Sequence, residues 1–101
     1  MIERRVTLNV PPDRGGDLEL LFDTEYARAM SEQPGFVSVS LLRENDNPQR
    51  YTMAIRFESE DAAAAWRASQ VHKALSPRLK EVHCGSEVTV HTVLSHVAST
   101  P

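Results

Sequence analysis

Hydrophobic and polar residues alternate along residues 2–10, and this two-residue period is typical of a strand with one buried face. The two prolines that follow end the strand, because proline has no backbone N–H to donate to a sheet. From residue 18 the apolar positions recur every three or four residues, which predicts an amphipathic helix over residues 18–33. Asp17 is placed to cap this helix, and Pro34-Gly35 stops it.

Two apolar runs, residues 36–43 and 50–58, flank a polar stretch with the composition of a turn. Together they predict a β-hairpin. In the second run the large apolar side chains occupy alternate positions and therefore share one face of the strand: Tyr51, Met53, Ile55 and Phe57.

A second helical region begins after the hairpin, with Ser59 as its N-cap and an alanine-rich stretch that leads to Trp66. We expect a break near Ser69 and a distortion or division at Pro77, because proline removes a helical hydrogen bond. The last apolar alternation runs over residues 87–97, which is nearly twice the usual strand length of about 5–6 residues.

The element order is therefore βαββαβ. It predicts an α+β, ferredoxin-like sheet with both helices on one face, in a single domain of residues 1–101. Exposed apolar sheet surface and an overlong edge strand both favour a partner, so we expect a homodimer. The apolar side chains that we expect on the face away from the helices are Val37, Val39, Leu41 and Val93.

Composition removes several classes of function. A net charge of −3, from 11 basic and 14 acidic residues, argues against a nucleic-acid partner. Cys84 is the single cysteine and can form neither an internal disulfide nor a thiolate zinc site. No apolar run approaches the ~18 residues of a membrane span and no signal-peptide core is present, so we expect a cytoplasmic protein with no membrane partner. Gly15-Gly16 lacks the lysine and the spacing of a phosphate loop, which disfavours nucleotide-derived cofactors.

The polar side chains on the strands offer little metal chemistry. His91 and His96 are an odd number of residues apart and face opposite ways on one strand, so we expect no metal site. Arg56 lies on the strand face that we expect inside a dimer. It either pairs across the interface with Glu87 or Glu58, or anchors an acidic substrate.

A set of short segments also occurs in a characteristic order: Gln33-Pro34-Gly35-Phe36, Leu41-Leu42-Arg43, Arg50-Tyr51, Phe57-Glu58-Ser59-Glu60-Asp61, Trp66 and Val71-His72-Lys73-Ala74-Leu75. Over about residues 4–97 this order resembles the antibiotic biosynthesis monooxygenase (ABM) family. The resemblance implies a ferredoxin-like protomer that dimerises sheet to sheet into an α+β barrel. It also implies a ligand pocket between the helices and the sheet of each protomer.

Members of the family include cofactor-free monooxygenases that oxidise polycyclic phenols to quinones, quinol monooxygenases and haem-degrading enzymes. The haem-degrading pattern has an asparagine on the first strand, a tryptophan in the second helical region, and a histidine nine or ten residues later. Trp66 fits this pattern, but Val6 takes the asparagine position, and Leu75 and Ser76 take the histidine positions. We therefore do not expect haem degradation.

The resemblance favours a cofactor-independent monooxygenase of secondary metabolism that acts on an aromatic, phenolic or quinol-like substrate. In this hypothesis His72 is catalytic and accepts the phenolic proton, which gives a phenolate able to react with dioxygen without a metal or other cofactor. On an unbroken helix His72 lies about 120° from Trp66, so a shared pocket needs a kink between them. The side chains expected to bind the substrate are Trp66, Phe22, Met53 and Phe57.

These residues also have structural interpretations. Trp66 can be a core anchor between helix and sheet, and His72 can be a solvated helix residue. The alternative function is a non-catalytic dimeric module that binds a small apolar ligand or assists another enzyme.

Overall fold

A computed structural model describes residues 1–99 of the chain. Within these residues four antiparallel strands form one sheet in the spatial order β2-β3-β1-β4. The strands are β1 (Ile2–Asn9), β2 (Phe36–Arg43), β3 (Arg50–Phe57) and β4 (Ser86–Thr92). This βαββαβ arrangement confirms the predicted ferredoxin-like fold.

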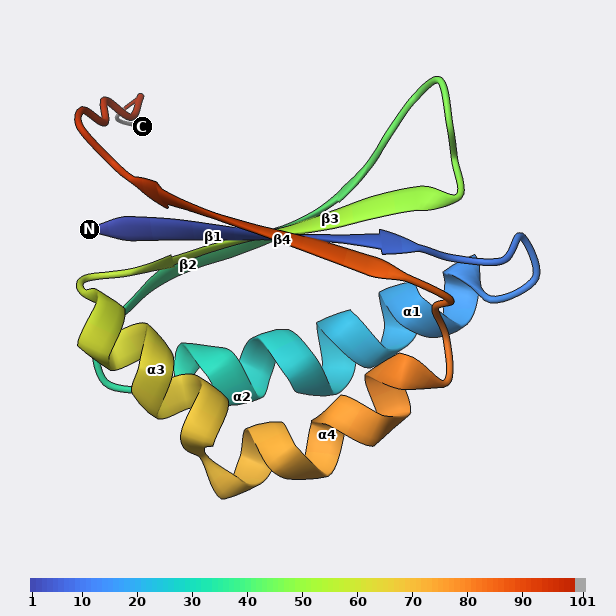
Figure 1. Cartoon of the computed structure of the whole chain (residues 1–101), viewed down its shortest axis with the longest axis horizontal. Helices are drawn as coiled ribbons and strands as arrows, with labels where there is room; N and C mark the ends of the chain where they lie inside the picture. The colour runs from blue at the N-terminus through green and yellow to red at the C-terminus, as the bar shows by residue number, and fades with distance from the viewer. Residues whose placement is uncertain (100–101) are drawn as a thin grey trace.

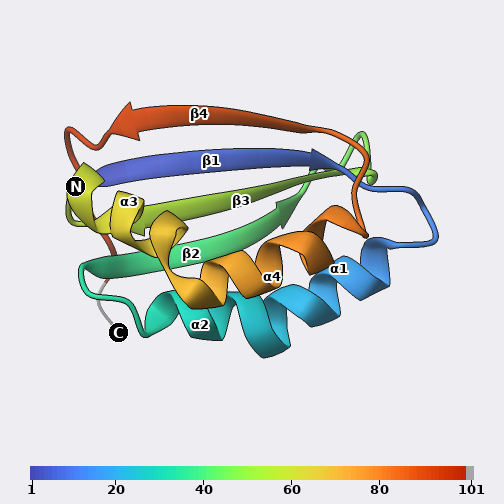
Figure 2. The same cartoon turned by 60° about the horizontal axis from the view of Figure 1, so that its bottom comes forward.

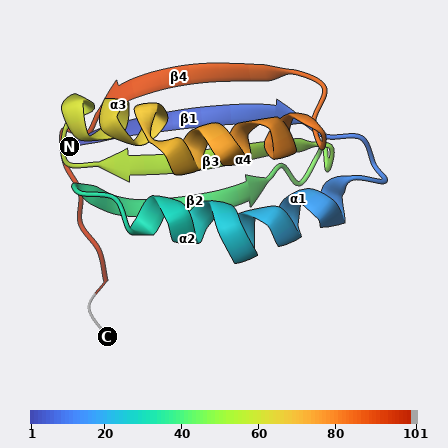
Figure 3. The ribbon, with the colours of Figure 1, turned by 90° about the horizontal axis from the view of Figure 1, so that it is seen from below.

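The helices form a layer on one face of the sheet (Figures 1 and 2). The first crossover is a continuous rod of α1 (Gly15–Leu21), the π-helical turn η1 (Phe22–Tyr26) and α2 (Ala27–Ser31). The second crossover contains α3 (Glu60–Ala68) and α4 (Gln70–Lys80). Seen from below, the first crossover runs along the edge strand β2, the second crossover lies over the central strands β1 and β3, and β4 extends beyond the helices (Figure 3).

The core lies between the helices and the inward face of the sheet. Phe57 and Met53 of β3 and Leu8 of β1 are almost completely buried, as the alternation along these strands predicts. Leu18 and Met30 fill the space beneath the first crossover. The edge strand β4 is less covered, because Val90 is 52% exposed although it pairs with Arg4 on the inward face of β1.

Several boundaries differ from the sequence prediction. The first helix begins at Gly15, so Asp17 lies inside its first turn and accepts a hydrogen bond from Arg14 Nε (2.8 Å) instead of capping the helix. The second crossover does break at Ser69, as expected, but α4 continues through Pro77 without division. The last strand ends at Thr92, so it is not overlong.

The outward face of the sheet is polar, which contradicts the predicted apolar face. A β-bulge at Val37 shifts the register of β2, so that Val39 pairs with Ile55 and Leu41 with Met53 on the helix side. Both side chains pack against the core, and of the four predicted apolar residues only Val37 remains more than one-third exposed (42%). Because one extra residue inverts the inside–outside alternation, the pattern of β2 alone did not reveal its orientation.

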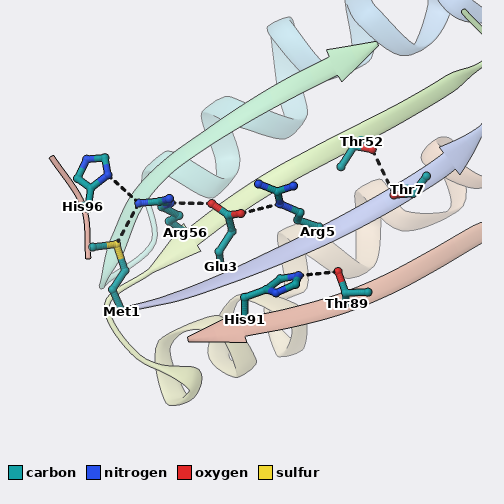
Figure 4. A network of polar contacts seen from close by, with 9 residues as sticks. All are labelled: Met1, Glu3, Arg5, Thr7, Thr52, Arg56, Thr89, His91 and His96. Atoms are coloured by element: carbon teal, nitrogen blue, oxygen red, sulfur yellow. Dashed lines mark hydrogen bonds and ion pairs between the residues drawn. The ribbon is translucent and has the colours of Figure 1, made fainter. Parts of the chain in front are cut away.

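An ion-pair network occupies this outward face (Figure 4). Glu3 is 8% exposed and accepts hydrogen bonds from Arg56 Nε (2.7 Å) and Arg5 Nε (2.6 Å). These donors hold the pKa of Glu3 below its usual value. Within the chain the carboxylate partner of Arg56 is Glu3, and a pair with Glu87 or Glu58 across a dimer interface stays a prediction.

After β4 the chain turns to the side of the sheet opposite the helices (Figure 1). There His96 Nδ1 lies 3.1 Å from Arg56 Nη1. Leu94 and Val97 in the same segment are 93% and 92% exposed. Among residues 1–99, no helix has the length and apolar character needed to cross a membrane.

Candidate functional site

A cavity of about 200 Å³ lies between the sheet and the second crossover. Inward side chains of β1 and β3 form its floor, including Val6, Met53 and Phe57. Trp66 of α3 and His72 of α4 form part of its roof, and residues of β4 line its remaining side. The cavity thus combines an apolar floor with polar groups on the helices, which is the usual composition of a small-molecule site.

Ser69 determines how the two helices present their side chains. Its backbone is extended (φ −69°, ψ 152°), so it ends α3 and begins α4. Its hydroxyl donates to the carbonyl oxygen of Trp66 (2.7 Å) and accepts from the backbone N–H of His72 (3.2 Å). One serine therefore caps both helices, and it provides the kink that a shared pocket needs.

The kink brings Trp66 and His72 into edge-to-face contact. Their ring centroids are 5.0 Å apart and their planes make an angle of 86°. Tyr26 of η1 packs against both rings, with centroids 5.7 Å from Trp66 and 6.3 Å from His72. Trp66 and Tyr26 are 3% and 4% exposed, so this cluster is a rigid wall of the cavity.

The surroundings of His72 favour its uncharged form. Burial lowers the pKa of the imidazole below its usual value of 6.5, and the positive charges of Arg67 and Arg4 lower it further. At neutral pH the ring is therefore neutral, and one of its nitrogens is a free proton acceptor.

Positive charge is concentrated in this cavity. Arg4, Arg67 and Lys80 line it, and none of the described residues that line it is a carboxylate. His83 also lines it, and its Nδ1 donates to the carbonyl oxygen of Leu79 (2.8 Å). The potential inside the cavity is consequently suited to an anion or to a group that becomes negative during a reaction.

The structure brings together most of the side chains proposed from the sequence. His72, Trp66, Met53 and Phe57 all line the cavity, whereas Phe22 is buried in the core and does not. Sequence reasoning missed Tyr26, Arg4, Arg67, Lys80 and His83. Of these residues, Arg4 could have been found from the sequence, because it is a charged residue on the otherwise apolar face of β1.

The remaining candidates lie elsewhere. His91 is on the outward face, where its Nε2 contacts Thr89 Oγ1 (2.9 Å), and His96 contacts Arg56. Cys84 is exposed and its Sγ lies 3.4 Å from the carbonyl oxygen of Asn9. Within the described part of the chain, no group of three or more histidine, cysteine, aspartate or glutamate side chains is arranged to hold a metal ion.

Comparison with known proteins adds a family. The model of a family described as antibiotic biosynthesis monooxygenase matches residues 1–78. A heme oxygenase (mycobilin-producing) of Mycobacterium tuberculosis is 36% identical over 59 residues. That match covers 58% of this chain and 55% of the relative, so the chain spans about half the length of the curated protein it matches.

Two solved structures have closely similar folds. SnoaB, a cofactor-independent oxygenase from Streptomyces nogalater, has a TM-score of 0.85 at 22% identity, with 97% of each chain covered. The heme-degrader MhuD from Mycobacterium tuberculosis, with two hemes bound in its active site, has a TM-score of 0.81 at 27% identity. That comparison covers 97% of this chain and all of MhuD (100%).

Proposed function

The chain belongs to the antibiotic biosynthesis monooxygenase family, and from this premise we propose that it is a cofactor-independent monooxygenase of phenolic or quinol-like aromatic compounds. The observation that carries the proposal is the placement of neutral His72 against Trp66 at an apolar cavity surrounded by cations. We expect the protein to act in the cytoplasm.

The first proposed step is removal of a proton from the substrate hydroxyl. An aromatic ring stacks against Trp66 above the apolar floor, which places its hydroxyl near His72. The neutral imidazole accepts the proton. The nearby arginines stabilise the resulting phenolate, because negative charge develops where the potential is positive.

The second proposed step is the reaction of that phenolate with dioxygen. For an anthrone-like substrate, one oxygen atom becomes the new quinone carbonyl and the other leaves as water. All four electrons needed to reduce dioxygen come from the substrate, so neither a metal nor an added reductant is consumed. The protein supplies orientation, deprotonation and exclusion of bulk water.

Replacement of His72 tests its role. We expect His72→Ala to lower kcat by about 10²–10⁴-fold, the usual contribution of a general base. The wild-type rate should rise with pH and level off, with a midpoint below 6.5, because the reactive form is the neutral imidazole and its pKa is lowered. This rise should be absent in the variant.

The matched control is His91→Ala, which removes an exposed histidine from the outward face. Its kcat and pH profile should equal those of the wild type. If His72→Ala retains wild-type turnover per folded molecule and only loses stability, His72 is a structural residue and the proposed mechanism is wrong.

Haem degradation is a second candidate, favoured by the 36% identity to a heme oxygenase. The residues present do not fit it well. At the two histidine positions of the haem-degrading pattern stand Leu75, which is 6% exposed, and Ser76. We expect no stoichiometric Soret shift when haem is added. A shift that disappears in His83→Ala or His72→Ala would favour this candidate.

A non-catalytic binding module remains the alternative if no phenol is turned over. The same apolar cavity would then hold a small aromatic ligand without reaction. Binding of naphthols that protects the protein against unfolding, without oxygen uptake for any phenol tested, would favour this alternative.

We also propose that the chain forms a homodimer through the outward face of its sheet. The support is the exposed Leu94 and Val97 on that side, together with the family resemblance. Light scattering should give twice the 11.3 kDa mass of one chain, and Leu94→Asp should favour the monomer. A wild-type mass of 11.3 kDa at micromolar concentration would contradict the proposal.

A further inference from the structure

Arg67 is incompletely satisfied in the cavity. Its Nη2 donates to Glu60 Oε1 at 3.1 Å, on the exposed side of α3. Its Nη1 is buried and has no hydrogen-bond partner among the described residues. A buried guanidinium nitrogen without an acceptor is costly, since the desolvation of a charged donor goes uncompensated. Arg67 also lines the cavity, so a guanidinium that turns toward the cavity can donate to an acceptor bound there.

Arg4 places a second positive charge at the same cavity. It projects from the inward face of β1, in register with Ile55 and Val90, where every neighbouring position on the strand face is apolar. Within residues 1–99 its guanidinium forms no ion pair. Burial and the nearby charge of Arg67 lower the pKa of Arg4, and the charge of Glu60, the partner of Arg67, opposes them in part.

This pair is not explained by the fold. A single strand residue facing the core at this position packs better as valine or isoleucine, and Arg56, which projects from the other face of the sheet, has a carboxylate partner in Glu3 (2.7 Å). Arg4 and Arg67 come from different elements, β1 and α3, and converge on one space. Among the described residues Arg4 has no ion pair and Arg67 is paired only through Nη2. Guanidinium groups that converge in this way are typical of sites that bind carboxylates.

We propose that Arg4 and Arg67 form a binding subsite for a carboxylate substituent on an aromatic ligand. This inference rests on the proposed function in one respect, since it makes the substrate a phenol that also carries a carboxylate. The ring lies against Trp66, the hydroxyl faces His72, and the carboxylate accepts hydrogen bonds from Arg67 Nη1 and Arg4.

Calorimetric titration with two matched probes tests the subsite without requiring turnover. The probes are 1-hydroxy-2-naphthoate and 1-naphthol, which share the ring and the hydroxyl and differ in the carboxylate. Charge-assisted hydrogen bonds contribute enough for the wild type to bind the naphthoate roughly 10- to 100-fold more tightly. In Arg67→Met, and independently in Arg4→Met, the ratio of the two dissociation constants should fall to within about threefold of one.

Arg78→Met is the matched control, because it also breaks an arginine–glutamate pair on the second crossover but does not touch the cavity. Its preference for the naphthoate should remain. The subsite is refuted if the wild type shows no preference or no naphthoate binding, or if both cavity variants keep the preference. If the protein prefers the naphthoate in an arginine-dependent way but takes up no oxygen, the subsite is upheld and the monooxygenase is rejected. If it turns over phenols but shows no preference for the naphthoate, the monooxygenase is upheld and the subsite is rejected.

Discussion

Ser69 holds the geometry on which the site depends, and Ser69→Ala tests this directly. The hydroxyl makes two hydrogen bonds, to the Trp66 carbonyl oxygen and from the His72 N–H. Loss of an N-cap serine costs about 1 kcal/mol, and loss of the second bond adds about 0.5–1.5 kcal/mol. We therefore expect Ser69→Ala to lower the free energy of unfolding by about 2 kcal/mol.

The effect on the site should exceed the effect on stability. Alanine favours the helical conformation, and a helix that continued through residue 69 would turn His72 about 120° away from Trp66. We expect kcat to fall about 10- to 100-fold, because small misplacements of a reacting group are costly. The imidazole pKa, followed by NMR, should rise toward 6.5 as His72 leaves its buried position beside Arg67 and Arg4.

Ser59→Ala provides the control. Ser59 caps α3 in the same way, accepting from the Ala62 N–H at 3.1 Å, but it does not connect Trp66 to His72. This variant should lose about 1 kcal/mol of stability, measured by urea unfolding, and keep the wild-type pKa of His72 and the wild-type kcat. If the two variants change the pKa and kcat equally, Ser69 acts through stability alone and the positioning argument fails.

Two further predictions concern the scaffold. Burial raises the pKa of the Tyr26 hydroxyl to about 12, whereas in the unfolded chain it ionises near pH 10. The contribution of Tyr26 to the free energy of unfolding is therefore fully present below pH 10. It should fall by about 3 kcal/mol as the pH rises to 12. Tyr26→Phe should lack this part of the decline in alkaline unfolding titrations, and an unchanged curve would show that Tyr26 ionises freely in the fold. Gly35 has φ +78° and an added Cβ would lie 2.7 Å from Ala62 Cβ, so Gly35→Ala should cost about 1–3 kcal/mol in urea unfolding. Gly16→Ala, at a helical position open to solvent, should instead add about 0.5–1 kcal/mol, and equal effects of the two changes would refute the reasoning.

The sequence was sufficient for the fold because its periods are unambiguous over most elements. The alternation in β3 and the N-cap at Ser59 gave the strand face and the helix start that the structure has. The β2 segment was different, since apolar residues at 36, 37, 39, 41 and 42 fit either face. Only the tertiary register, with its bulge at Val37, decides between them.

Part of the site was predictable from the geometry of an α-helix. The need for a kink between Trp66 and His72 follows from helical geometry, and Ser69 meets it. Phe22 and Tyr26 are four residues apart and share one face of the first crossover, so the helical period alone does not decide which of them lines the cavity. The convergence of Arg4 and Arg67 depends on how α3 crosses the sheet, which the sequence pattern does not contain.

The most direct test of the proposed monooxygenase is the fate of isotopically labelled dioxygen. Metal-free protein would be incubated with a carboxylated anthrone-type phenol, with the rate in buffer alone subtracted, and the product analysed by mass spectrometry. The account predicts one labelled oxygen atom per quinone, one dioxygen consumed per product, and a rate that falls about 10²–10⁴-fold in His72→Ala. Oxygen uptake no faster than in buffer, or uptake unaffected by His72→Ala, would contradict it.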